Sequence, residues 1–143
     1  MKFIKSKKRS KKATEFSKKE WALADIEHYG KASDWSEKGY YIQVTEGDEV
    51  LGLMHYTLIC GVIEISTFIV SHKHRGKGIG TKLIKKIEDI AKKDNVHKIY
   101  LVTGDGWKAE DFYTKMGFEK TGEHKNHYLH KDWIIYSKFL SYL

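Results

Sequence analysis

The sequence predicts a mixed α/β fold with a central sheet and flanking helices, on three observations. Strand-like segments alternate with amphipathic segments that have helical periodicity. Residues 62–70 are almost continuously apolar, which is typical of a central strand covered on both faces. The order strand 62–70, helix 79–93, strand 98–103 forms a β–α–β unit, so those two strands are expected to be parallel.

The N-terminal region is predicted to be helical. Ser17 and Glu20 have capping-box spacing, which places a helix from about residue 18 to residue 30. A weak strand is expected at 3–4 before it and one short helical turn at 33–37 after it.

The remaining residues are predicted to complete a single domain covering residues 1–143. Strands are expected at 40–46, 49–60, 62–70, 98–103, 118–125 and 133–139, with the last two as an antiparallel pair. Helices are expected at 79–93, where apolar residues form one stripe, and at 107–116, which Gly117 ends.

Positive charge is concentrated at the N-terminus. Residues 1–12 hold seven Lys or Arg and no acidic residue, whereas the rest of the chain carries 19 of each sign. Such a basic segment suits a solvated, flexible arm or contact with a polyanion, and nucleic acid is the weaker expectation. With one cysteine, no apolar run near 20 residues and no signal-peptide pattern, we expect a cytoplasmic protein without membrane contact.

The stretch Arg75-Gly76-Lys77-Gly78-Ile79-Gly80-Thr81 is the main functional signal. It lies between an apolar strand and an amphipathic helix, where unpaired amide donors and the helix dipole attract a phosphate. It lacks the Gly-Lys-Ser/Thr ending of a P-loop, and its glycines do not have the dinucleotide spacing. What remains is Arg-x-x-Gly-x-Gly, a pattern that also occurs in plain solvated loops.

A second motif lies about thirty residues downstream, Ala109-x-x-Phe112-Tyr113-x-Lys115-x-Gly117-Phe118. The two motifs at this separation resemble the GNAT superfamily of acyl-CoA-dependent N-acyltransferases, closely over about residues 62–120. The resemblance implies a mostly antiparallel sheet in which two parallel strands splay apart. It also implies acetyl-CoA as cosubstrate, with no metal. The cofactor-binding residues that it implies are Phe68, Ile69, Val70, Arg75, Gly76, Lys77, Gly78, Ile79, Gly80, Thr81 and Tyr113.

Two residues are candidates for catalysis. Tyr113 matches the tyrosine of this family that protonates the departing CoA thiolate, a reasonable general acid because a phenol lies beside a forming thiolate. Glu64 is the only charge in its apolar strand and matches a base that some members use. Both also have structural readings, a packed tyrosine and a solvent-facing glutamate. The sequence departs from the family at Gly106, where an asparagine often contacts the cofactor.

Other chemistry-bearing residues are weaker candidates. Cys60 is not expected to be a nucleophile, and His72 and His74 are more simply loop residues than a base. The spacing of His124, His127 and His130 puts successive histidines on opposite strand faces, so no metal site is expected. In the family, the acceptor pocket includes the region of Trp21, Tyr29 and Trp35, but aromatic residues at helical spacing are often core.

The sequence therefore predicts an enzyme that transfers an acetyl group from acetyl-CoA to a primary amine by direct transfer. The acceptor could be a small-molecule amine or a protein amine, and a homodimer is an option. The alternative is a CoA-binding or non-catalytic acyltransferase-like module that its basic N-terminal arm recruits to nucleic acid or a partner.

Overall fold

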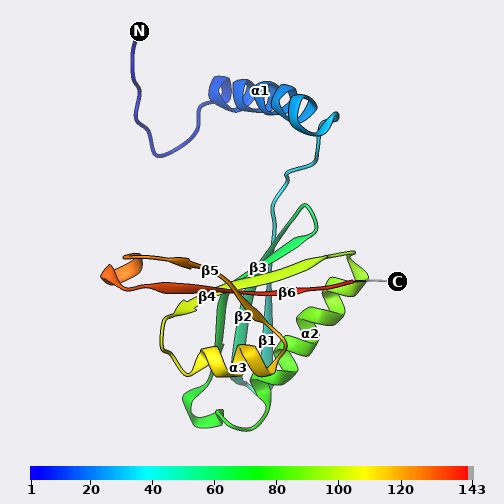
Figure 1. The fold of residues 1–143 in the computed structure, drawn as a ribbon, viewed down its shortest axis with the longest axis vertical. Coiled ribbons are helices and arrows are strands. Elements are labelled where there is room, and N and C mark those ends of the chain that lie inside the picture. Colours follow the sequence, from blue (N-terminus) through cyan, green and yellow to red (C-terminus); the bar gives the residue numbers. More distant parts are fainter. Residues whose placement is uncertain (142–143) are drawn as a thin grey trace. The chain divides into compact units, whose positions relative to one another are not determined.

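The computed structural model describes residues 1–141, which divide into two compact units, residues 1–35 and the remainder of the chain. Figure 1 shows each unit, and each is described by itself. Among residues 1–141, no helix is long and apolar enough to cross a membrane.

The first unit is one helix and the segment that folds back on it. Helix α1, Lys11–Tyr29, begins at Ser10, whose side chain accepts a hydrogen bond from the Ala13 amide at 3.1 Å. It ends at Gly30, which adopts a left-handed conformation with φ +76°. Asp25 is buried and accepts hydrogen bonds from the Ser33 amide at 3.1 Å and the Trp35 indole at 2.9 Å.

Three local predictions in this unit were wrong. Ser17 lies inside α1, because Ser10 already caps a run of good helix formers seven residues earlier. Residues 3–4 are not a strand, and their side chains are exposed. Residues 33–37 do not form a helical turn, because Asp25 binds the backbone and the indole of this segment instead.

The second unit contains a six-stranded sheet in the order β1-β2-β3-β4-β6-β5. The strands are β1 (Lys38–Glu46), β2 (Glu49–Ile59), β3 (Val62–Val70), β4 (Lys98–Gly104), β5 (Glu119–His124) and β6 (Trp133–Phe139). Among these six strands within residues 1–141, β3 and β4 pair in parallel and every other neighbouring pair is antiparallel. The predicted fold class, strand segments and parallel pair are confirmed, with boundary differences of one or two residues.

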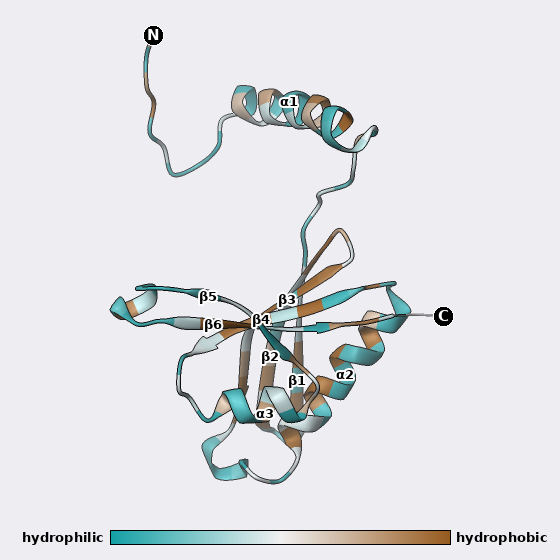
Figure 2. Cartoon of the chain, in the orientation of Figure 1, coloured by the Kyte–Doolittle hydropathy of each residue, from teal (hydrophilic) through white to brown (hydrophobic). Residues whose placement is uncertain are grey.

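Helices α2 (Ile79–Lys93) and α3 (Ala109–Lys115) join the sheet in one hydrophobic core. The apolar stripe of α2 is buried against the strands at Ile79, Leu83, Ile84, Ile87 and Ala91. Figure 2 shows this apolar side of α2 together with the apolar strands of the sheet. The single buried residue of α3 is Tyr113, whose ring lies 6.1 Å from Tyr136 of β6 and 6.2 Å from Phe68 of β3. The core therefore fixes both helices against the strands that carry the candidate site.

Candidate active site

The parallel strands β3 and β4 separate partway along their length. Their register runs from Val62 opposite Lys98 to Ile65 opposite Leu101, yet β3 continues to Val70 and β4 to Gly104. A cavity of about 470 Å³ lies at this point of separation, lined by residues of both strands. The backbone groups of the separated segments are available to a ligand because the two strands no longer pair there.

A β-bulge lies at the same point. In the pairing of β2 with β3, His55 is opposite Thr67 and Tyr56 is opposite Ile65, so Ser66 is the extra residue. Ser66 lines the cavity between the strands, and its Oγ lies 2.6 Å from Nδ1 of His55. Sequence reasoning missed this pair, because a bulge depends on the register of two strands and leaves no local pattern.

The glycine-rich loop contains two glycines with a left-handed backbone. Gly76 and Gly78 have φ near +80°, and a Cβ at either position would meet no atom within 4 Å. The first hydrogen bond of α2 runs from the Lys82 amide to the Gly78 carbonyl at 3.0 Å, so the earlier amides of the helix have no intrahelical acceptor. These donors and the positive end of the helix dipole lie beside a second cavity of about 590 Å³.

Most of the residues predicted to bind the cofactor line these two cavities. The second cavity is lined by Phe68, Val70, Arg75, Gly76, Gly78, Ile79, Gly80, Thr81 and Tyr113 of the predicted set. Of these two cavities, Ile69 lines the one between the strands but not the second, and Lys77 lines neither. Phe68, Arg75 and Tyr113 line both cavities, so the two cavities are neighbours that share part of their walls.

Lys108 is a cationic residue that sequence reasoning missed. It lines both cavities, next to Ala109 at the start of α3. Asp105, the neighbour of Gly106 and a candidate to replace the cofactor contact of the family's asparagine, lines a different cavity. The Gly106 amide donates a hydrogen bond to the side chain of Glu110 at 2.8 Å, so the backbone of this glycine contacts the first turn of α3.

Tyr113 is buried in an aromatic cluster. Its ring packs near Phe112, Phe118 and Tyr136, with centroid distances of 5.5, 5.9 and 6.1 Å. Burial raises the pKa of the Tyr113 phenol to about 12, so the hydroxyl keeps its proton at neutral pH. The residue is thus both a core residue and part of the walls of both cavities, and its role as a general acid stays a prediction.

Glu64 lies one residue before the strands separate and is only partly buried. Its parallel neighbour is Tyr100, and the two side chains are hydrogen bonded. Burial, and after it this hydrogen bond, raises the pKa of Tyr100 to about 12. Glu64 is not among the residues that line the cavity between the strands, which begin at Ile65.

The other candidates are dispersed. His74 lines the second cavity and lies 3.1 Å from the Ser71 hydroxyl, whereas His72 lies outside it. The rings of His124 and His127 stack at 4.6 Å, and no set of three His, Cys, Asp or Glu residues within 1–141 could hold a metal. Cys60 is exposed at the turn between β2 and β3.

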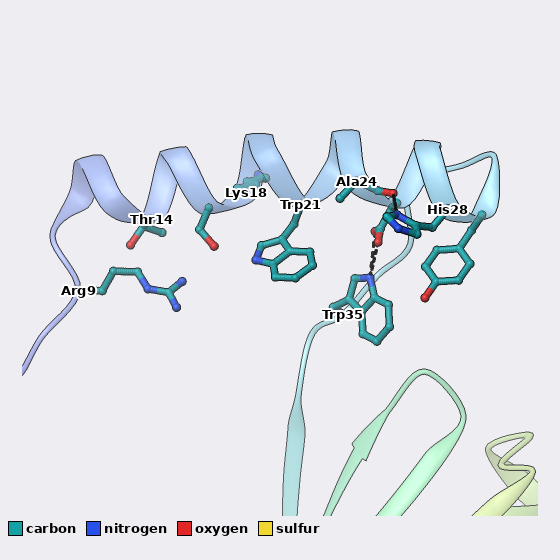
Figure 3. Close-up of a pocket in the computed structure, with 10 residues that line it drawn as sticks. Arg9, Thr14, Lys18, Trp21, Ala24, His28 and Trp35 are labelled. Atoms are coloured by element: carbon teal, nitrogen blue, oxygen red, sulfur yellow. Dashed lines mark hydrogen bonds between the residues drawn. The ribbon is translucent and has the colours of Figure 1, made fainter.

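The three aromatic residues suggested for substrate contact lie together in the first unit. Trp21, Tyr29 and Trp35 line one groove of about 610 Å³ along α1, formed only by residues of that unit. Figure 3 shows Trp21 and Trp35 on the same side of the helix, with the indole of Trp35 hydrogen bonded to Asp25. Their suggested role in substrate contact stays a prediction.

Comparison with known proteins agrees with this geometry. The model of the acetyltransferase (GNAT) family matches residues 7–118. The chain belongs to the GNAT family. Among curated proteins, it is 29% identical to the uncharacterised protein YdhI of Bacillus subtilis over 110 residues, 74% of this chain and 66% of that protein. The match thus spans slightly less than two thirds of that relative.

Solved structures of this GNAT fold are similar over most of the chain. An acetyltransferase from Bacillus cereus matches with a TM-score of 0.73 and 21% identity, covering 97% of this chain and 98% of that one. A GNAT acetyltransferase from Elizabethkingia anophelis, solved with acetyl-CoA bound, matches at 0.65 and 24% identity, over 71% and 76%. Naa50 of Arabidopsis thaliana, bound to the bisubstrate analogue CoA-Ac-MVNAL, matches at 0.65 and 28% identity, over 70% and 72%.

Proposed function

We propose that this GNAT protein is an N-acetyltransferase that moves the acetyl group of acetyl-CoA directly to a primary amine. The observation that carries the proposal is the pair of cavities that share Phe68, Arg75 and Tyr113 in their walls. One lies at the helix start suited to a pyrophosphate and the other between the separated strands. Two similar proteins have been solved with acetyl-CoA or a CoA-containing analogue, which supports the choice of cosubstrate.

The cosubstrate would bind along this path. The amides of residues 76–81, with Arg75 and Lys108, bind the pyrophosphate, and the free edge of β3 at residues 68–70 binds the amides of the pantetheine arm. Binding far from the reacting atoms then fixes the thioester between β3 and β4, which lowers the entropic part of the barrier.

In the reaction, the nitrogen of a neutral amine attacks the thioester carbonyl carbon, and the carbon–sulfur bond breaks. The thiolate takes the proton of Tyr113, whose raised pKa keeps the phenol protonated at neutral pH, and the phenolate that forms takes a proton back from water. The amine proton passes to Glu64, through water because Glu64 lies just outside the cavity. The Ser66–His55 pair is the competing route for that proton, since Ser66 lines the cavity.

A calorimetric titration with acetyl-CoA, followed by a thiol-release assay over a panel of primary amines, tests the proposal. We expect saturable binding and CoA release that depends on the amine. Binding without release for any amine would favour the alternative, a non-catalytic CoA-binding module. The exposed basic residues 1–12 would then be its contact to nucleic acid or a partner.

A further inference from the structure

A third cavity, distinct from the two described above, lies where the loop between β4 and α3 meets the hairpin of β5 and β6. Its volume is about 660 Å³. Three aromatic residues line it, Trp107 from the loop and Tyr128 and Trp133 from the hairpin. We call this cavity the aromatic pocket.

The walls of the aromatic pocket are held in place before any ligand arrives. The ring of Trp133 meets Trp107 at 5.2 Å and Tyr128 at 5.4 Å, both edge to face, and the Trp133 indole donates to the Tyr128 carbonyl at 3.1 Å. Trp107 lies directly against Gly104, where a Cβ would come within 2.3 Å of the indole. Leu129 has a left-handed backbone with φ +57°, a conformation that costs energy for a residue with a Cβ.

Two carboxylates also line the aromatic pocket. Asp105 and Asp132 belong to its two sides, and the Asp105 amide donates to the Asp132 carbonyl at 3.2 Å. Asp132 accepts a hydrogen bond from the Asn126 amide at 2.9 Å and is paired with Lys125 at 3.2 Å, and these two contacts, the first more than the second, lower its pKa. Asp105 forms no salt bridge among residues 1–141, and the cation that its charge acts on is Lys120, which is itself paired with Glu123 at 2.8 Å. Lys131, an exposed cation, lies on the same rim.

The aromatic pocket adjoins the proposed reaction site. Trp107 lines both the aromatic pocket and the cavity between β3 and β4. The two cavities therefore share the Trp107 indole as a wall, and an acceptor with two amines connected by an alkyl chain would place one amine on each side of it.

We propose that the aromatic pocket binds the ammonium group of an acceptor that carries a second amine, as a linear diamine does. Aromatic faces and carboxylates together favour an organic cation. The nitrogen that attacks the thioester must be neutral, so the bound ammonium is the other nitrogen of the same molecule. This inference names the acceptor class and rests on the proposed acetyl transfer.

The first test compares 1,4-diaminobutane with butylamine, which has the same carbon chain and one amine. We expect kcat/KM for the diamine to be about tenfold higher or more, the effect of one partly desolvated cation–aromatic contact. Tyr128→Leu and Asp105→Asn should each remove most of this preference and leave the value for butylamine unchanged. Phe139→Leu and Glu119→Gln, exposed residues at the far ends of β6 and β5, are matched controls that should retain it. Equal use of the two amines by the unmodified protein would overturn the proposal.

The second test measures binding without turnover, by following the indole N–H signals of Trp107 and Trp133 in NMR titrations with each amine. We expect the diamine, and not butylamine, to shift both signals, and Asp105→Asn to weaken the effect. Shifts without acetylation of any amine would support the aromatic pocket and contradict the proposed function. Acetylation without a diamine-specific shift would contradict the aromatic pocket alone.

Discussion

At the scale of single residues, Tyr113 combines packing with a proposed chemical role. Tyr113→Phe removes only the hydroxyl, so we expect turnover to fall by about 10²–10⁴-fold, the usual contribution of a general acid. The affinity for acetyl-CoA should change little because the ring still packs against Phe68 and Phe118. Steady-state kinetics measures the turnover and calorimetry on the same preparation measures the affinity for acetyl-CoA. If chemistry limits the rate and Tyr113→Phe still turns over at the wild-type rate, Tyr113 is a core residue only.

The proposed base gives a different pH signature. Glu64→Gln keeps the volume and removes the proton acceptor, so the loss of turnover should be largest at low pH, where the acceptor amine is protonated. At high pH the amine loses its proton unaided, and the rate should partly recover. His55→Gln tests the competing route through Ser66. A pH–rate profile of Glu64→Gln that runs parallel to wild type, with a changed profile for His55→Gln, would transfer the role to His55.

The raised pKa of Tyr113 also has a consequence for stability. Its phenol titrates at about 12 when folded and near 10 when unfolded. Between these values the unfolded chain has lost the proton and the folded protein has kept it, so rising pH favours unfolding. We expect the free energy of unfolding of Tyr113→Phe to fall less steeply above pH 10, by up to about 1.4 kcal/mol per pH unit. Urea denaturation from pH 9 to 11.5 measures this, with Tyr41→Phe as a control on an exposed ring. Identical slopes in wild type and Tyr113→Phe would contradict it.

At the scale of elements, the start of α2 is the proposed phosphate site. Gly78→Glu places a carboxylate at the helix start, in a left-handed conformation at φ +81°, so we expect acetyl-CoA binding to be lost. Gly47→Glu is the matched control, because Gly47 also has a positive φ and open space but lies in the turn between β1 and β2. Calorimetry on both variants, with melting curves, separates lost binding from lost folding. Undiminished affinity in Gly78→Glu would refute the site.

At the scale of the whole molecule, folding depends on the second unit. All buried hydrophobic residues among 1–141 lie between Leu51 and Tyr136. Deletion of residues 1–12 should therefore leave the melting temperature and the acetyl-CoA affinity nearly unchanged. Differential scanning calorimetry and isothermal titration check this. A collapse of the melting temperature would show that the basic segment supports the fold, and a selective loss of polyanion binding would support the alternative function.

Much of the second unit could be predicted from the sequence because its signals are local. The apolar residues of α2 recur at intervals of three and four residues, which predicts an amphipathic helix. The continuous apolar run at 62–70 predicts a central strand. Gly76 and Gly78 adopt positive φ angles because glycine has no Cβ, a property of the residue type that the sequence shows directly. These signals arise from neighbours along the chain, so no tertiary contact was needed to interpret them.

Tertiary structure alone decided the rest. The Ser66–His55 pair exists because the register of β2 and β3 shifts by one residue, and no local pattern encodes a register shift. The aromatic pocket brings Trp107 against Trp133, 26 positions later, because β4 and β6 pair with Gly104 opposite Trp133. The sequence by itself thus determined the family, the strands and the position of the glycine-rich loop, whose phosphate binding stays a prediction. The pairing of distant strands determined which side chains meet around the cavities, because that pairing is settled only when the whole sheet packs.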